Sequence, residues 1–351
     1  MKWYTISTHS TLKGVFTLQI FSDAPHPKLI MKSIKSERFE LGENQLLVGS
    51  GKSGINLILG HMRASKYLVS KNSQIFVPQW MGQWVYIAML NNAIPVFKFN
   101  KEVRCIYVYH QFGFLQDMLD IAQFANENDL LIIEDSAHLL KIENDQSRIH
   151  FFGHYALSSP PKFLSMPPIG ILEAEDARFR DYVSNEKANS SKLKPYTVSL
   201  RQSYIHKQST LKKPNTNLLD ELNYKLYSSY LFTHNTTRSA VKRLSSLSDE
   251  YENRIGRMNL VYSQFEQQRL PIMTAQQGKV AVLKVPIFVS DKEIDLLTSR
   301  EPWALNYLIH FDRNQNLLKP NHQKAIAIPM HAQISESEFA NTISKLASLL
   351  K

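Results

Sequence analysis

Two residues near the middle of the chain, Asp135 and Lys162, have the types and the spacing to do chemistry together. Asp135 closes an aliphatic run, Leu130–Ile133, that is typical of a buried strand, and an ionised carboxylate there is costly unless a positive group meets it. Lys162 follows in a proline-flanked stretch, Ser158–Leu164 (SSPPKFL). A strand-end acid and a lysine in a tight loop could hold pyridoxal phosphate (PLP), with the acid on the pyridinium nitrogen and the lysine as Schiff-base partner. The alternative is a solvated acid and a surface lysine.

A second candidate site is the small-residue segment Gly49–Gly54 (GSGKSG). A Walker A loop needs a glycine five positions before its Gly-Lys-Ser unit, and Leu46 stands there, so that motif is absent. Small residues between a strand and a helix still expose backbone N–H groups at a helix N-terminus, which favours a bound phosphate. A plain strand–helix turn is the competing interpretation.

Strand and helix patterns alternate through the first 135 residues. Strands are expected at Gln45–Val48, Gln74–Val77, Ile94–Phe99, Val103–Tyr109 and Leu130–Ile133, and helices at Ile55–Met62, Trp84–Leu90 and around Leu115–Glu127. This alternation predicts a largely parallel sheet with helices on both faces. Ligands on such sheets bind at the carboxyl ends of the strands, where both Asp135 and the glycine segment lie.

The remaining segments are less regular. Residues 1–40 are expected to form an irregular arm with a short strand at Val15–Phe21. The polar, basic residues 186–216 are expected to form a long loop or an exchanged segment. Further expected elements are a helix at Leu247–Gln268 with a Glu250/Arg254 pair one turn apart, strands at Val280–Val285, Ile287–Val289 and Ala325–Ile328, and a last helix that begins near Ser335 with a capping box. We expect a large domain over 1–240 and a small one over 241–351.

The composition restricts the class of protein. The chain has 351 residues, 43% of them hydrophobic and 21% charged, which is typical of a two-domain globular enzyme. A net charge of +10 favours an anionic partner or substrate, such as a phosphate, a nucleotide or an acidic membrane surface. No nucleic-acid-binding signature and no metal-ligand pattern is recognised. The single cysteine, Cys105, predicts a buried thiol in a reducing compartment. No stretch approaches the roughly 20 apolar residues that span a bilayer, so we expect a cytoplasmic protein without a membrane partner.

Six segments, in the same order, resemble the DegT/StrS family of PLP-dependent sugar aminotransferases, within the aspartate aminotransferase (fold type I) superfamily. These segments are Val48–Leu59 (VGSGKSGINLIL), Val77–Phe97 (VPQWMGQWVYIAMLNNAIPVF), His110–Met118 (HQFGFLQDM), Ile133–His138 (IEDSAH), Gly153–Leu172 (GHYALSSPPKFLSMPPIGIL) and Ala325–Leu346. The resemblance implies a large PLP-binding domain with a mostly parallel seven-stranded sheet flanked by helices, and a smaller C-terminal α+β domain. It also implies a homodimer with the site at the subunit interface.

The resemblance implies a role for each matched residue. Lys162 would bind the cofactor covalently and later move a proton, and Asp135 would keep the ring nitrogen protonated. The other implied cofactor contacts are Gly51, Lys52 and Ser53 at the phosphate, Ser159 or Ser158 as an added hydroxyl, His138 near the phenolic oxygen, and Trp80 or Trp84 stacked on the ring. The sequence leaves the choice between the two tryptophans open, and either could instead belong to the core.

The implied function is transfer of an amino group, usually from glutamate, to a nucleotide-linked keto sugar, in surface-polysaccharide or natural-product synthesis. Four features depart from the family pattern. Lys52 replaces the usual threonine, His154 replaces an acidic residue, and the Lys162 loop is shorter than in most members. The Gly-x-Asn-x-Arg element that reaches the partner subunit is not recognisable in residues 186–235. Asn235 and Arg238 are the candidate substitutes. The departures motivate an alternative, a catalytically altered homologue that serves as a regulatory or binding protein. Sugar dehydration is disfavoured, because dehydratase relatives carry a histidine in place of the lysine.

Overall fold

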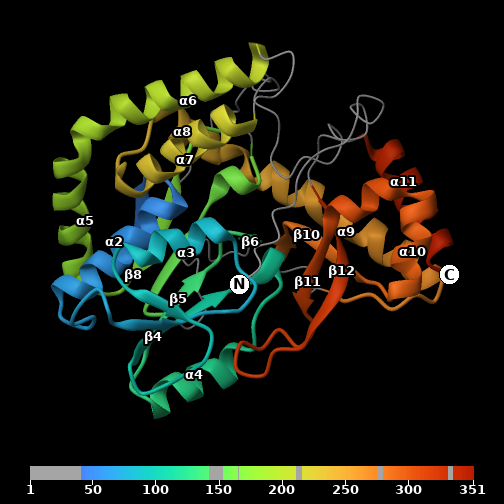
Figure 1. Ribbon diagram of the computed structural model, residues 1–351, viewed down its shortest axis with the longest axis horizontal. Coiled ribbons are helices and arrows are strands. Elements are labelled where there is room, and N and C mark those ends of the chain that lie inside the picture. Colours follow the sequence, from blue (N-terminus) through green and yellow to red (C-terminus); the bar gives the residue numbers. More distant parts are fainter. Residues whose placement is uncertain (1–40, 142–152, 165, 211–215, 275–279, 331–334) are drawn as a thin grey trace.

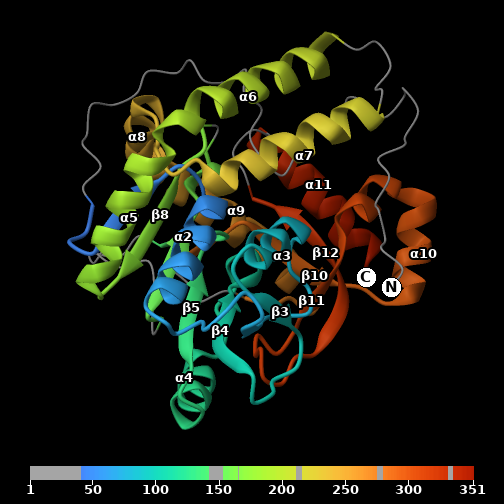
Figure 2. The same cartoon turned by 60° about the vertical axis from the view of Figure 1, so that its left-hand side comes forward.

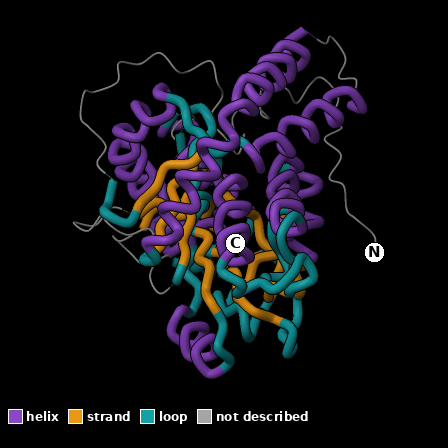
Figure 3. The backbone as a smooth tube through the Cα atoms, turned by 90° about the vertical axis from the view of Figure 1, so that its left-hand side faces the viewer, coloured by secondary structure: helices purple, strands orange, loops and turns teal. Residues whose placement is uncertain are grey.

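The computed structural model describes residues 41–141, 153–164, 166–210, 216–274, 280–330 and 335–351 (Figure 1). The arm expected over residues 1–40, with its strand at Val15–Phe21, lies outside the described residues. In the described part, strands gather in the middle of the molecule and helices surround them (Figure 3).

Seven strands form the main sheet, in the order β1-β8-β7-β5-β4-β2-β3. They are β1 (Gln45–Val48), β2 (Gln74–Phe76), β3 (Ile94–Val96), β4 (Val103–Tyr109), β5 (Leu131–Asp135), β7 (Tyr155–Ser158) and β8 (Gly170–Ala174). Neighbouring strands run parallel from β7 through to β3, whereas β8 is antiparallel to both of its neighbours. The predicted α/β class with a mostly parallel seven-stranded sheet is therefore confirmed, although the sequence analysis assigned no strands at β7 and β8.

Both faces of the sheet are covered, which explains why its central strands are almost continuously apolar. On one face, α2 (Gly51–Ala64), α3 (Gln83–Leu90) and α5 (Ala177–Asn189) pack over side chains that include Cys105 and Tyr107 of β4. On the other face, α4 (Met118–Glu127) packs over Ile106 and Val108 of the same strand (Figure 2). Cys105 is fully buried as predicted, and burial raises the pKa of its thiol.

The prediction of a long loop over residues 186–216 is wrong. The described residues of this region belong to α5, to α6 (Leu193–Thr210) and to α7 (Thr216–Phe232), and α6 and α7 lie side by side (Figure 2). Pro195 does not break α6, because it stands in the first turn, where backbone N–H groups have no helical partner. The polar residues that suggested a loop belong to the end of α5, to the 3-10 turn Ser190–Lys192 and to α6.

The C-terminal part is built on a three-stranded antiparallel sheet, β10-β12-β11. Its elements are α8 (Arg238–Arg243), α9 (Leu247–Gln267), β9 (Val280–Val282), β10 (Lys284–Phe288), α10 (Asp291–Arg300), β11 (Leu308–Asp312), β12 (His322–Pro329) and α11 (Glu336–Leu349). The predicted capping box at Ser335 and Glu338 is present, and α10 begins with another at Ser290 and Glu293. Strand β6 (Leu139–Lys141) of the N-terminal part pairs with β9, so backbone hydrogen bonds join the two parts.

The predicted Glu250/Arg254 pair is confirmed as a buried ion pair on α9. Arg254 Nε donates to Glu250 Oε1 at 2.7 Å, and its Nη1 donates to the carbonyl oxygens of Val282 and Leu283 at 3.3 Å each. Its guanidinium also lies 4.9 Å from the ring centroid of Phe163, the residue after Lys162. Arg254 therefore connects the C-terminal part to the loop that carries Lys162. None of the helices in the described ranges is long and apolar enough to cross a membrane.

Candidate active site

The carboxyl ends of β4, β5 and β7 bring the predicted chemistry together. Tyr109 is the register partner of Asp135 on one side, and Leu157 is its partner on the other. The backbone N–H of Ser136 donates to the carbonyl oxygen of Leu157 at 2.9 Å, which keeps the two strand ends joined beyond the sheet. Asp135 is therefore held in place by strand pairing on both sides. It lies at the carboxyl end of a central strand, where ligands bind in such sheets.

Asp135 is almost completely buried, with 2% of its surface exposed. Tyr107 Oη donates to its Oδ2 at 2.6 Å, and the backbone N–H of Ala137 donates to its Oδ1 at 2.9 Å. Burial raises the pKa of Asp135, while these two hydrogen bonds and the positive charges of Lys162 and His110 act to lower it. A cation that reached this carboxylate would relieve the cost of its burial.

His138 stands three residues beyond Asp135, in the turn after β5. Its Nδ1 lies 2.6 Å from Tyr109 Oη, and its ring is stacked on Phe112 with centroids 5.6 Å apart. Burial, followed by the nearby charges of Lys162 and Lys284, holds the pKa of His138 well below its ordinary value. The imidazole is therefore neutral at pH 7, and its orientation is set from two sides.

Phe112 itself adopts a left-handed backbone conformation, with φ 54°. Such a conformation is uncommon for a bulky residue and collects at functional sites. The ring of Phe112 stacks on Phe311 of β11 as well as on His138, with 6.1 Å between the Phe112 and Phe311 centroids. The strained turn thus places one aromatic ring between the candidate site and the C-terminal sheet.

Lys162 ends a short 3-10 turn, Pro160–Lys162, whose backbone is held by the Lys162 N–H donating to the carbonyl oxygen of Ser159 at 3.0 Å. The side chain of Lys162 is exposed, whereas Phe163 beside it is buried against Arg254. The charge of Lys162 acts on the pKa of Asp135, His138 and Lys52. The turn that carries Lys162 follows β7, where Leu157 pairs with Asp135 and Ser159 faces Gly51, and this geometry places the lysine next to the other predicted residues.

The glycine segment forms the start of α2. The helix begins at Gly51, four residues before the predicted start, and Ser50 caps it by accepting from the Ser53 N–H at 3.0 Å. Ser53 is buried, and its Oγ lies 2.7 Å from Nδ1 of His234. A side chain on Gly51 would place its Cβ only 3.4 Å from the Cβ of Ser159. The N-terminus of α2 and the hydroxyl of Ser159 therefore face each other closely and form a cradle, in which a Cβ at position 51 would just touch Ser159.

Lys52 lies in an aromatic environment. Its Nζ is 3.7 Å from the ring centroid of Tyr227 and 5.8 Å from that of Trp84, and these two rings are 4.7 Å apart. Burial, and then the positive charge of Lys162, lower the pKa of Lys52 to about 7. Lys52 can therefore exchange its proton near neutral pH, and an anion bound at the helix start would favour its charged form.

The structure separates the two candidate tryptophans. Trp84 lies beside Lys52, at the start of α3 and near the N-terminus of α2. Trp80 instead stacks on His310 of β11, with centroids 4.5 Å apart and planes 10° from parallel. Of the two hydroxyls, Ser159 lies at the cradle, and Ser158 is the last residue of β7, in register with Ile171. Asn235, a candidate for the partner-reaching element, donates through Nδ2 to the carbonyl oxygen of Lys187 at 2.7 Å.

These residues fit PLP in chemical type and placement. The buried Asp135 suits a pyridinium nitrogen, the cradle at Gly51 suits a phosphate, and Lys162 suits the aldehyde. Three supporting residues were not predicted from the sequence, namely Tyr107, Tyr227 and His234. Tyr107 and Tyr109 could have been noticed, because two tyrosines that alternate in a buried strand each need a hydrogen-bond partner. Tyr227 and His234 lie about 180 residues beyond Lys52 and Ser53, and no local pattern links them.

The comparison with protein families agrees with this chemistry. The family described as "Putative PLP-dependent aminotransferase" matches residues 32–348, and the chain belongs to it. The protein is a PLP-dependent aminotransferase. No curated protein matches the chain in sequence.

Solved structures with the same fold are distant in sequence. PseC of Helicobacter pylori, an aminotransferase of pseudoaminic acid biosynthesis, is 13% identical, with a TM-score of 0.55 over 88% of this chain and 87% of that one. Spr1654 of Streptococcus pneumoniae, described as a sugar aminotransferase and solved in its PMP form, is 10% identical, with a TM-score of 0.53 over 87% and 85%. NtdA of Bacillus subtilis, with bound PMP, is 12% identical, with a TM-score of 0.53 over 87% and 73%. At these identities the likeness establishes the fold alone, which is that of the fold type I aminotransferases.

Proposed function

We propose that the protein transfers an amino group from an amino-acid donor, glutamate in the first instance, to a keto sugar carried on a nucleotide. The observation that carries this proposal is geometric: β4, β5 and β7 end side by side at Asp135 and His138, and the turn from β7 to Lys162 meets the Gly51 start of α2 at Ser159. The nature of the acceptor is supported by the folds of sugar aminotransferases such as PseC and Spr1654 and by the net charge of +10, which suits a diphosphate.

PLP, when bound, supplies an electron-accepting ring that carries the amino group from donor to acceptor. Asp135 would hold a proton at the ring nitrogen, because a buried carboxylate gains most from a cation in contact with it. Lys162 would attach the cofactor through Nζ and then take up and return the proton of the reacting carbon. His138, kept neutral and held by Tyr109, would hydrogen-bond the phenolic oxygen without adding a second charge.

The phosphate would lie at the start of α2. Its contacts would be the backbone N–H groups of Gly51 and Lys52, the hydroxyl of Ser159 and the ammonium of Lys52. Ser53 would act chiefly by fixing the turn, because its hydroxyl already lies against His234. The aromatic residue that would stack on the cofactor ring is Trp84 rather than Trp80, because Trp84 lies beside Lys52.

We further propose that the protein works as a homodimer with the site at the subunit interface, and that the domains span 1–240 and 241–351. Support for a second copy comes from aromatic side chains on α6 and α7 that are left open to solvent, among them Tyr196 at 55% and Tyr224 at 57% exposure. Sedimentation of the purified protein tests the dimer, and a monomer at micromolar concentration would contradict it.

The visible spectrum of purified protein tests the proposed function. We expect uptake of PLP to produce an absorption band in the visible range, and glutamate to bleach that band as the amino group is transferred. A panel of nucleotide-linked keto sugars should then restore the band with one member at least. A bound cofactor that no amino donor changes would favour the binding-protein alternative. Restoration by simple oxo-acids but by no sugar would refute the proposed acceptor.

A further inference from the structure

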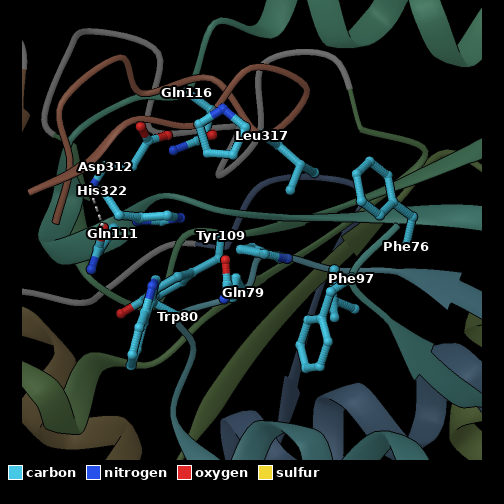
Figure 4. Close-up of a pocket in the computed structure, with 13 residues that line it drawn as sticks. Phe76, Gln79, Trp80, Phe97, Tyr109, Gln111, Gln116, Asp312, Leu317 and His322 are labelled. Carbon is cyan, nitrogen blue, oxygen red and sulfur yellow. Dashed lines mark hydrogen bonds between the residues drawn. The ribbon is translucent and has the colours of Figure 1, made fainter. Parts of the chain in front are cut away.

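A cavity lies beside the candidate site, on the other side of Tyr109. Its walls come from the ends of β2, β3 and β4 and from the β11–β12 loop, and Figure 4 shows Trp80, Phe97, Tyr109 and His322 around it. Of the residues predicted from the sequence to bind the cofactor, Trp80 alone lines this cavity, and its ring stacks on His310 and not near Lys52. Tyr109 is shared, because it lines the cavity and its hydroxyl meets His138.

The charges of the lining exclude an ionic ligand. No lysine or arginine is found among the described residues that line the cavity. The one carboxylate, Asp312, accepts the backbone N–H groups of Asn314, Asn316 and Asn321 at 2.8–3.1 Å, which satisfies it within its own loop. A phosphate or carboxylate would find no counter-charge here, and an ammonium would find a carboxylate already engaged.

The uncharged polar groups favour a ligand with hydroxyls. His322 Nδ1 is buried and has no hydrogen-bond partner within the described part of the chain. Gln116 Nε2 makes only a long contact of 3.5 Å, with Gln315 Oε1. The side chain of Gln79 is exposed at the mouth. These planar groups can each give or receive a hydrogen bond, and a hydroxyl can do both.

The size and the apolar walls narrow the ligand further. The volume of the cavity is about 60 Å³. Because a cavity volume of this kind needs about 10–15 Å³ to hold one water, there is room for roughly four to six waters. At about 30 Å³ of liquid for each water, that is roughly 120–180 Å³, which is the size of one monosaccharide ring and too small for a nucleotide. Trp80, Phe97 and Tyr109 supply flat apolar faces on which the C–H face of such a ring packs.

We propose that this cavity is a binding site for one uncharged, hydroxyl-bearing sugar ring. The inference deepens the proposed function, on which it rests for the source of the ring, a sugar of the acceptor substrate. Trp80 is then a specificity residue of the sugar and not the aromatic partner of the cofactor. Through Tyr109 and His138, an occupied cavity also lies one hydrogen bond from the candidate active site.

Binding can be measured directly, without turnover. We expect saturation-transfer NMR of the full-length protein to show binding of methyl α-D-glucopyranoside or methyl N-acetyl-β-D-glucosaminide. Trp80→Ala should weaken binding about tenfold or more, and His322→Ala should weaken it measurably. The matched control is Tyr67→Ala, since Tyr67 is 47% exposed, against 42% for Trp80, and lies beyond the far end of α2. If Trp80→Ala does not fold, Gln79→Ala at the mouth of the cavity serves in its place.

Three outcomes would overturn the proposal: binding of neither glycoside, glycoside binding that survives Trp80→Ala in a folded protein, or Trp80-dependent binding of uridine without the glycosides. The last would make the cavity a base site. The test separates this inference from the proposed function, since amino transfer without glycoside binding refutes the cavity alone. Glycoside binding by a protein that never transfers an amino group refutes the proposed function alone.

Discussion

Asp135 and Lys162 are held in place by two different kinds of structure. Asp135 ends a central strand that is paired on both sides, it is 2% exposed, and it receives two hydrogen bonds. Lys162 ends a three-residue turn, and its side chain is exposed. Beneath that turn, Phe163 packs on Arg254, a residue about 90 positions further along the chain. The acid is thus positioned by the sheet, whereas the lysine is positioned by packing from the C-terminal part.

This difference predicts that a mutation can disturb Asp135 without disturbing the Lys162 loop, and the reverse. A change within the sheet should alter the electrostatics of Asp135 and leave the Lys162 loop in place. A change in the Glu250–Arg254 pair should loosen the loop and leave Asp135 unchanged. Each of the following variants tests one side of this division.

Removal of the lysine itself should have the largest effect. Lys162→Ala should lower the rate of amino transfer from glutamate by about 10²–10⁴-fold or more, because it removes the group that moves the proton. It should also abolish covalent labelling of the protein by borohydride and PLP, as measured by mass spectrometry. Lys98→Ala, a change at an exposed lysine, is the control. Labelling that persists in the Lys162 variant would place the covalent link elsewhere.

The support of the loop should show the next largest effect. Arg254→Met leaves Glu250 buried without its partner and should lower the free energy of unfolding by about 3–5 kcal/mol, measured in urea. It should also slow covalent attachment of PLP. The double change Glu250→Gln with Arg254→Met should recover much of the stability. Lys324→Met breaks an exposed pair with Asp291 and should cost about 0–1 kcal/mol. Equal losses of unfolding free energy in Arg254→Met and Lys324→Met would contradict the proposed role of the buried pair.

The hydrogen bond to the acid should show a smaller and different effect. Tyr107→Phe removes a bond worth about 1.5–3 kcal/mol to a charged group. Because that bond lowers the pKa of Asp135, its loss should raise the pKa, and the acidic limb of the rate–pH profile should move to higher pH. Tyr155→Phe is the matched control, because its hydroxyl bonds to His61 instead. A shift of the acidic limb in both variants would show that Tyr107 has no special connection to Asp135.

The smallest expected effect concerns Lys52, and it is a change in the number of protons taken up when PLP binds. Its pKa of about 7 means that Lys52 is mostly neutral at pH 8, and a bound phosphate should restore its proton. Calorimetry of PLP binding at pH 8, in buffers of different ionisation enthalpy, should show up to about one more proton taken up by the wild type than by Lys52→Met. Equal proton uptake by the two proteins would contradict contact between Lys52 and the phosphate.

The same shift has a consequence for stability. A lysine whose pKa is lower in the folded than in the unfolded state binds fewer protons when folded, between about pH 7 and 10.5. The contribution of Lys52 to stability should therefore rise with pH across that window. Lys52→Met should remove this part of the pH dependence, measured by urea unfolding without cofactor. An unchanged slope would show that Lys52 keeps its ordinary pKa.

Local patterns predicted the strands and helices around the site well. Strand β4 has its predicted ends, β5 runs to Asp135 itself, and α3 begins one residue before its predicted start. These elements follow from apolar runs and turn residues that act over a few positions. The prediction failed at residues 186–216. The helices there are rich in polar residues and are stabilised by packing on neighbouring helices, so they lack the apolar pattern by which a helix is recognised.

The sequence alone determined the class of chemistry. An acid after an aliphatic run, a lysine between prolines and small residues before a helix are local features that are compatible with PLP, and the colinear resemblance of six segments to the DegT/StrS family turned them into a prediction of this cofactor. Only the tertiary structure decided which residues support them. Tyr227 reaches Lys52, His234 reaches Ser53, and Arg254 reaches Phe163 of the Lys162 loop, across 91 to 181 positions. In the same way, the tertiary structure places Trp84 beside Lys52 and Trp80 against His310. Contacts of this kind depend on how elements pack, and no short-range pattern in the chain records them.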